Sequence, residues 1–187
     1  MAEFDLIPES PLNGLRRTFE HIAVEEVSGR AVVSVAFSDR AGLEQAMRTN
    51  LDLTLPFVGN TARVETRDLL VLSLQSDQIF VLFPQTGYRP DLEIAEIAGD
   101  HGCVTDQSDG WALLRVSGPR SRAALERICM LDLHQDIFTV GAVARTVMEH
   151  LGVIIHRDDE HSFLLMSARS SAGSFAHSVV TSAENVS

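Results

Sequence analysis

The stretch LDLHQDIFTVGAVART, residues 131–146, has a fainter copy earlier in the chain, LDLTLPFVGNTARV, residues 51–64. Both begin with Leu-Asp-Leu and later contain Ala-Arg, and upstream Leu43-Glu44 matches Leu125-Glu126 in nearly the same register. The offset is about 80 residues, well above the periods of solenoid repeats. Three matches in one order therefore predict an internal duplication.

The elements predicted in the first half follow a clear order. Residues 31–37 (AVVSVAF) are typical of a buried strand, and a helix follows with Ser38 or Asp39 as its cap. A loop then leads to three short strands within residues 61–84. A helix begins at Pro90, since proline suits the first helical position.

The second half repeats this order. A turn at Asp109-Gly110 precedes a strand over residues 111–117, and a helix begins after Gly118-Pro119. The Leu-Asp-Leu loop follows, then three strands within residues 143–168 and a closing helix over 170–183. The pattern predicts an α+β fold: a duplicated β-α-β-β-β-α unit with pseudo-twofold symmetry.

The repeat also predicts the organisation of the chain. We expect an extended N-terminal arm over residues 1–20, a first α+β half over 21–99 and a second half over 100–187, packed with the first as one unit. A small sheet with helices on one face leaves its other face or an edge exposed. Two copies can cover these surfaces, for example by exchanging a strand.

The repeated loop phrase is interpreted as structural. Its leucines would anchor the connection between helix and strand, and one phenylalanine in each copy would plug the loop. These residues are Leu51, Leu53 and Phe57 in the first copy, and Leu131, Leu133 and Phe138 in the second.

Composition sets further limits on the function. The 187 residues are 45% hydrophobic and 22% charged, which are ordinary globular values. The formal net charge of -11 argues against a nucleic-acid or anionic-membrane surface. No apolar run is long enough to span a bilayer, and the start lacks a signal segment. Cys103 and Cys129 are predicted to be buried thiols, which favours a cytoplasmic protein.

All 15 basic residues are arginines, so the chain contains no lysine. A Schiff-base lysine, a pyridoxal-phosphate site and a P-loop each require the lysine amine. The sequence therefore excludes these classes.

Histidines and cysteines are weak candidates for chemistry. His101 with Cys103, and Cys129 with His134, lack the doubled spacing of a zinc site. A serine or cysteine nucleophile would need a histidine base and a third orienting group. The candidate bases are His150, His156 and His161. The favoured interpretation is that His156 and His161 lie near the ends of a hairpin.

Charged clusters leave two alternatives open. An anion site could form at the helix that follows Gly118, but a solvated helix face is the favoured interpretation. The arginines concerned are Arg115, Arg120, Arg122 and Arg127. The acidic stretch from Asp91 to Asp109 is interpreted as a solvated surface, with a metal site or docking face as alternatives and no EF-hand spacing.

The N-terminal segment mixes prolines with isolated apolar residues and has no partner in the repeat. Such an arm either moves freely in solvent or lies in a groove of another protein. Its apolar side chains favour docking: Phe4, Leu6, Ile7, Leu12 and Leu15.

The second half carries a specific family resemblance. Its motifs are Asp-Gln-Ser-Asp at 106–109, Leu113 to Gly118, the helix at Arg122, Leu-Asp-Leu-His at 131–134, Phe138, Gly141 and Ala-Arg-Thr at 144–146. With these motifs the chain resembles the gamma subunit of heterotetrameric sarcosine oxidase. The first half agrees in outline through Ser10-Pro11-Leu12, Leu55-Pro56 and Asp77-Gln78. The likeness covers nearly the whole chain and is specific over about residues 103–170. One departure is Arg169-Ser170-Ser171-Ala172, where the family usually has Arg-Ser-Phe-Ala.

The resemblance implies an aminomethyltransferase-like folate-binding fold, itself internally duplicated. It also implies a complex that oxidises sarcosine to glycine, passing the one-carbon unit to tetrahydrofolate and the electrons to oxygen. FAD, FMN, NAD, tetrahydrofolate and zinc are then expected in the alpha, beta and delta subunits, with alpha the chief partner. The gamma chain itself is expected to bind no cofactor and to supply no catalytic or metal-ligating residue.

Two other functions stay open from the sequence. One is a stand-alone folate-binding protein for one-carbon transfer, in which Asp106 or Asp109 would grip the pterin. The other is a homodimeric binding module that has no large partner. A gamma subunit kept isolated from its complex could also form a homodimer.

Overall fold

Two antiparallel sheets form the centre of the computed structural model, which describes residues 9–187. The β8 sheet has the order β1-β2-β8-β11-β10-β9, and the β3 sheet has the order β4-β5-β6-β3-β7. The strands are β1 (Arg16–Thr18), β2 (Ala23–Glu26), β3 (Arg30–Ala36), β4 (Thr61–Val64), β5 (Leu69–Gln75), β6 (Gln78–Pro84), β7 (Cys103–Asp106), β8 (Trp111–Ser117), β9 (Val143–Met148), β10 (Leu151–Asp159) and β11 (Ser162–Ala168).

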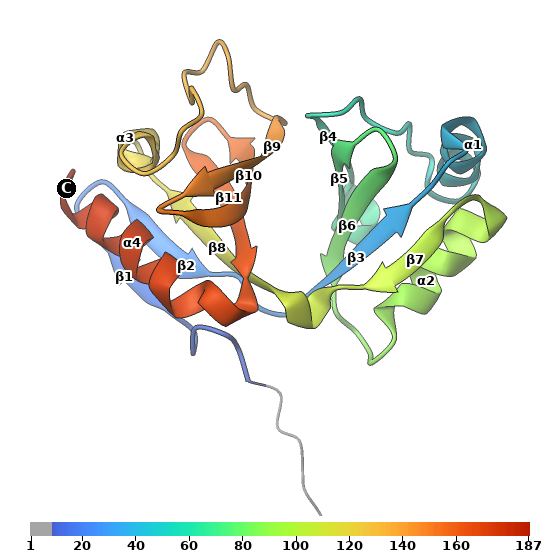
Figure 1. Ribbon diagram of the computed structural model, residues 1–187, viewed down its shortest axis with the longest axis horizontal. Coiled ribbons are helices and arrows are strands. Elements are labelled where there is room, and N and C mark those ends of the chain that lie inside the picture. Colours follow the sequence, from blue (N-terminus) through green and yellow to red (C-terminus); the bar gives the residue numbers. More distant parts are fainter. Residues whose placement is uncertain (1–8) are drawn as a thin grey trace, which may run out of the picture.

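Helices cover the outer face of each sheet (Figure 1). They are α1 (Arg40–Leu51) and α2 (Pro90–Ala98) on the β3 sheet, and α3 (Ser121–Glu126) and α4 (Ala172–Glu184) on the β8 sheet. Short 3-10 turns lie at η1 (Glu65–Arg67), η2 (Gly99–His101), η3 (Ser108–Gly110) and η4 (Arg169–Ser171).

The two sheets share one strand order. In each half, the strand before the first helix pairs with the last of the three later strands, and the other two follow toward the edge in reverse order. The two rows are β3-β6-β5-β4 and β8-β11-β10-β9. On the other side, β3 pairs with β7 and β8 pairs with β2. Each of these two strands lies in the sheet formed mainly by the other half of the chain. The expected exchange of a strand therefore occurs in both directions.

This order supports the predicted pseudo-twofold relation, which stays a prediction. The predicted boundaries are 1–20, 21–99 and 100–187. The two sheets do not follow these boundaries, because β2 and β7 each pair with a strand of the other half. The predicted α+β class agrees with the sheets and helices present.

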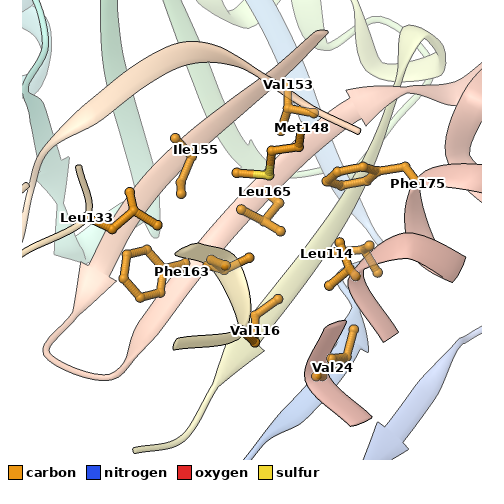
Figure 2. Packing of buried hydrophobic residues seen from close by; sticks show 14 of the residues in the cluster. Val24, Leu114, Val116, Leu133, Met148, Val153, Ile155, Phe163, Leu165 and Phe175 are labelled. Carbon is orange, nitrogen blue, oxygen red and sulfur yellow. The ribbon is translucent and has the colours of Figure 1, made fainter. Parts of the chain in front are cut away.

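Alternation along the strands builds three apolar cores. On β8, Leu114 faces the helices and Leu113 faces the other sheet, and on β3 Val33 and Val32 do the same. Successive side chains of a strand point to opposite faces of the sheet. Each sheet therefore carries apolar side chains on both of its faces. Figure 2 shows the core beneath α3 and α4, which includes Phe163.

The third core lies between the sheets. Phe80 on β6 and Trp111 on β8 meet edge to face, with ring centroids 5.7 Å apart. Arg145 on β9 lies over the Phe80 ring at 5.2 Å and donates to Gln78. The inner faces therefore pack directly against each other at this end.

Local predictions were mostly confirmed. The predicted strand over 111–117 coincides with β8, and Asp39 caps α1 by accepting from the Gly42 amide at 3.0 Å. The helix predicted after Gly118-Pro119 is α3, which ends at Glu126. No helix among residues 9–187 is long and apolar enough to cross a membrane.

The loop anchors were predicted with one error. Leu53, Leu133 and Phe138 are buried, as expected. Phe57 is 84% exposed, so its predicted role as a plug is wrong. Leu55, two residues before Phe57, is buried in the same cluster as Leu53.

One further prediction needs correction. Cys103 is exposed, because it begins the edge strand β7, and Cys129 is only half-buried. The predicted docking residues Phe4, Leu6 and Ile7 lie outside the described residues. Leu12 and Leu15 are half-buried and pack against the core beneath α3 and α4. Their role in docking stays a prediction.

Candidate functional site

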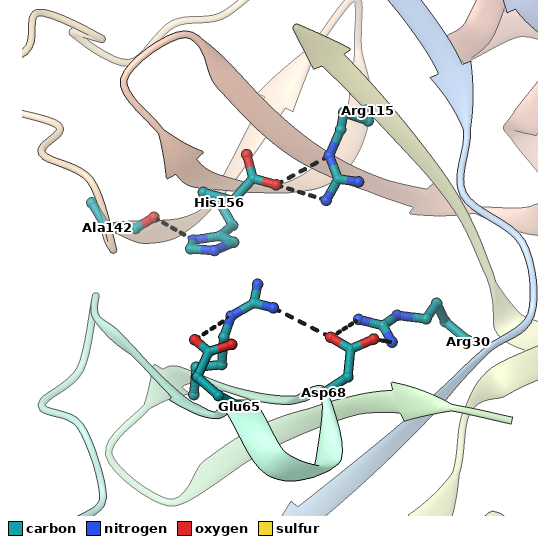
Figure 3. A network of polar contacts seen from close by, with 8 residues as sticks. Arg30, Glu65, Asp68, Arg115, Ala142 and His156 are labelled. Atoms are coloured by element: carbon teal, nitrogen blue, oxygen red, sulfur yellow. Dashed lines mark hydrogen bonds and ion pairs between the residues drawn. The ribbon is translucent and has the colours of Figure 1, made fainter.

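Charged side chains also meet between the two sheets. Figure 3 shows His156 and Arg115 of the β8 sheet opposite Arg30 and Asp68, which belong to the β3 sheet side. Arg63 on β4 and Asp158 on β10 complete the group. We call these six residues the intersheet cluster.

The strand register explains why they converge. Arg115, Leu164 and His156 are direct neighbours across β8, β11 and β10. Arg63 lies beside Leu70, and Leu70 lies beside Leu82. The leucines belong to the core between the sheets. Side chains in one cross-strand row point to the same face, so the charged residues point between the sheets as well.

Asp68 links two of the arginines. It accepts hydrogen bonds from Arg30 and, at 3.3 Å, from Nη1 of Arg63. Asp68 adopts φ 47°, in the left-handed region that aspartate tolerates at a turn. The hydrogen bond from Arg30 lowers the pKa of Asp68 below its ordinary value, so this carboxylate stays ionised.

Asp158 forms a second, more enclosed pair. Its Oδ2 accepts from Nε and Nη2 of Arg115 at 3.1 and 2.7 Å, and its side chain is only 10% exposed. The register of β10 and β11 shifts between Arg157 and Asp159, so Asp158 lies in a bulge. Its Oδ1 is buried and has no hydrogen-bond partner among the residues that the structure describes.

His156 is 3% exposed and lies beside this pair. Its Nδ1 is 3.1 Å from the Ala142 carbonyl oxygen. A carbonyl only accepts, so in the neutral ring Nδ1 carries the hydrogen and Nε2 is an acceptor. Burial lowers the pKa of His156, and this effect is stronger than the opposing hydrogen bond to Ala142. The imidazole is therefore neutral near pH 7.

These residues border a cavity of about 270 Å³. Apolar side chains complete its wall: Val27, Leu70, Leu82, Leu113 and Leu164. The wall carries positive charge from three arginines, negative charge from two aspartates, and a neutral histidine. Such a site can hold a small polar molecule, because its donors and acceptors are already oriented.

The structure separates the histidines and cysteines considered from the sequence. His101 lies 3.5 Å from Asp39, and His134 lies 3.6 Å from Asp136, both half exposed. Among residues 9–187, no group of three or more His, Cys, Asp or Glu side chains could hold a metal ion. Burial raises the pKa of the Cys129 thiol, which disfavours the thiolate.

The three histidines predicted as candidate bases lie at different places in the β8 sheet. His150 lies in the turn before β10 with φ 68°, and His161 lies at the next turn beside Glu160. His156 alone of the three borders the intersheet cavity. No serine or cysteine is among the described residues that line it.

The predicted arginine cluster is not brought together. Arg115 points between the sheets, whereas Arg122 pairs with Glu126 at 3.4 Å on the exposed side of α3. Asp106 accepts from Ser108, and Asp91 pairs with Arg89. The two aspartates proposed to grip a pterin, Asp106 and Asp109, do not line the intersheet cavity.

Sequence reasoning missed most of the intersheet cluster. In the sequence Arg63 stands out only as part of the repeated Ala-Arg pair, and Asp158 carries no signal of its own. The available signal was a charged or histidine residue in an otherwise apolar strand, as in LGVIIHRDD over 151–159. Such a residue faces a partner across the sheet or lines a cavity.

No family model matches the chain. The sarcosine oxidase subunit gamma of Arthrobacter sp is 27% identical over 180 residues, which is 89% of this chain and 87% of that protein. The subunit gamma of Corynebacterium sp. strain P-1 is 25% identical over 126 residues, 67% of this chain and 60% of the relative.

Two solved structures share the fold. A chain of the heterotetrameric sarcosine oxidase from Corynebacterium sp. U-96 aligns with a TM-score of 0.81 and 20% identity over 95% of both chains. Aminomethyltransferase T of the glycine cleavage system from Bartonella henselae aligns with a TM-score of 0.69 and 14% identity, over 92% of this chain and 57% of that one. The resemblance predicted from the sequence is confirmed: this chain is similar to sarcosine oxidase gamma subunits over most of its length.

Proposed function

We propose that this chain is the gamma subunit of a heterotetrameric sarcosine oxidase and acts as an accessory, non-catalytic subunit. The observation that carries the proposal is the match to sarcosine oxidase gamma subunits over nearly the full length of both proteins. A chain of a heterotetrameric sarcosine oxidase also has the same fold over 95% of each chain.

The proposed complex oxidises sarcosine to glycine and passes the one-carbon unit to tetrahydrofolate. FAD, FMN, NAD, tetrahydrofolate and zinc would be held by the alpha, beta and delta subunits. This chain would stabilise the large alpha subunit by contact, with no residue of its own in the reaction.

Exposed apolar side chains support a binding role. Phe57 and Val58 are 84% and 51% exposed, and Ile137 and Val140 are 68% and 56% exposed. Backbone bonds join their two loops, because Asn60 bridges to Ala142 and Thr61 donates to the Gly141 carbonyl. Exposed apolar groups that lie together mark interaction sites. The two loops are the copies of the repeated phrase, and we propose that they contact the large subunit.

Co-expression with the candidate large subunits, followed by size-exclusion chromatography, tests the contact. The double variant Phe57→Ser and Ile137→Ser is expected to lower the amount of chain that co-elutes with the large subunit. Tyr88→Ser is the matched control, because Tyr88 is 99% exposed but lies between β6 and α2. If the double variant and the wild type co-elute with the large subunit in equal amounts, the two loops are not part of the interface.

A second measurement tests the accessory role. The purified chain alone is expected to show no sarcosine-dependent oxygen consumption and no bound flavin. Turnover by the chain alone would reject the proposal. Saturable tetrahydrofolate binding by the isolated chain would favour the stand-alone one-carbon protein. Light scattering on the isolated chain would identify a homodimer.

A further inference from the structure

The intersheet cavity leaves one buried acceptor without a donor. Oδ1 of Asp158 has no hydrogen-bond partner within residues 9–187, although Oδ2 of the same group accepts twice from Arg115. A buried charged acceptor without a partner is costly, so such an atom usually meets a water or a ligand. Nε2 of His156, deduced above to be an acceptor, belongs to the same wall.

The arginines around the cavity have donors to spare. Arg63 makes one hydrogen bond with a described residue, from Nη1 to Asp68, and its Nε lies 3.8 Å from Glu65. Arg115 uses Nε and Nη2 on Asp158, which leaves Nη1 without a described acceptor. Each guanidinium presents five N–H donors in a plane, an arrangement that matches a carboxylate.

Charge and volume restrict the ligand. Three arginines, two aspartates and a neutral histidine give the wall one net positive charge, which favours a ligand that carries a carboxylate. The volume of about 270 Å³ lies below the range of about 300–1,000 Å³ for pockets that hold drug-sized ligands. A ligand that contacts the unpartnered Asp158 oxygen must also carry a hydrogen-bond donor.

We propose that the intersheet cavity binds a small monocarboxylate that carries a neighbouring hydroxyl or amino group. The carboxylate accepts from Arg63 and Arg115, and the hydroxyl or amino group donates to Asp158. The ligand would join the two sheets, since Arg63 belongs to the β3 sheet and the other two residues belong to the β8 sheet. This proposal does not depend on the accessory role.

Isothermal titration calorimetry of the full chain tests the proposal with four simple probes. Glycolate and glycine have both groups, acetate lacks the donor, and glycolamide lacks the carboxylate. We expect one saturable site for glycolate or glycine. Whichever of the two binds more tightly shows whether a hydroxyl or an amino group is the preferred donor to Asp158. Acetate should bind about threefold to tenfold more weakly, which is the loss of one hydrogen bond. Glycolamide should not bind.

Matched variants locate the site. Arg63→Gln is expected to weaken glycolate binding about tenfold or more, because it removes a charged hydrogen-bond donor. Arg145→Gln is the control, since Arg145 is the repeat counterpart of Arg63 and is not among the residues that line the cavity. Asp158→Asn should reduce the difference between glycolate and acetate. Thermal unfolding of each variant checks that it is folded.

Two results would overturn the proposal. One is the absence of saturable binding for every probe, in which case water alone fills the cavity. The other is equal binding by the Arg63→Gln and Arg145→Gln variants, which would place any bound carboxylate elsewhere.

Discussion

Leu133 anchors the second copy of the repeated loop, so its truncation should destabilise the whole fold. Leu133 is 0% exposed and packs in the core beneath α3 and α4 (Figure 2). The loop around it has no strand or helix, and its short backbone bonds run from Ile137 and Phe138 to His134. Leu133 and Phe138 are the two buried apolar anchors of this loop, and Arg157 also donates to the Phe138 carbonyl at 2.8 Å.

Leu133→Ala removes buried methyl groups and leaves a cavity. Leucine-to-alanine changes in protein cores lower the free energy of unfolding by about 2–5 kcal/mol. We expect a value in the upper part of that range, because Leu133 is fully enclosed. Urea denaturation followed by circular dichroism measures it, with the midpoint and slope compared with wild type.

Ile137→Ala is the matched control in the same loop. Ile137 is 68% exposed, so its truncation should change the free energy of unfolding by about 0.5 kcal/mol or less. Leu53→Ala, at the equivalent buried position of the first copy, should resemble Leu133→Ala. If Leu133→Ala and Ile137→Ala destabilise the chain equally, the repeated phrase is not a structural anchor.

Three other predictions concern titration, pairing and reactivity. Burial lowers the pKa of folded His156, so the unfolded chain takes up more protons below about pH 6.5, and stability should fall as pH drops from 7 to 5. Thermal unfolding should show a shallower fall for His156→Asn, and an unchanged slope would contradict this account. Arg115→Met should cost about 1–3 kcal/mol of unfolding free energy, because it leaves buried Asp158 unpaired. Adding Asp158→Leu should restore part of that loss in urea denaturation, and no recovery would argue against the pair. Exposed Cys103 should react quickly with a thiol reagent and half-buried Cys129 slowly; a fast phase that survives Cys103→Ser would refute the assignment.

The sequence predicted elements whose own pattern was strong. β8, with the apolar run WALLRVS, was located correctly, and so was α1 with its Asp39 cap. β2 and β7 were missed, because AVEE and CVTD are short and partly polar and gain their conformation by pairing with β8 and β3. Their positions depend on the exchange between halves, which local pattern does not encode.

The intersheet cluster was hard to predict for a similar reason. Arg63 and Asp158 are far apart in sequence, and only the packing of two sheets brings them to one cavity. Phe57 and Leu55 illustrate the limit within one loop. Both are apolar and two residues apart, yet one is exposed and one is buried, and backbone geometry decides which.

Native mass spectrometry of this chain co-expressed with the candidate alpha, beta and delta subunits tests the central claim most directly. We expect a four-subunit assembly that contains one copy of this chain and oxidises sarcosine. An active assembly that forms without this chain, while the chain elutes alone, would contradict the account.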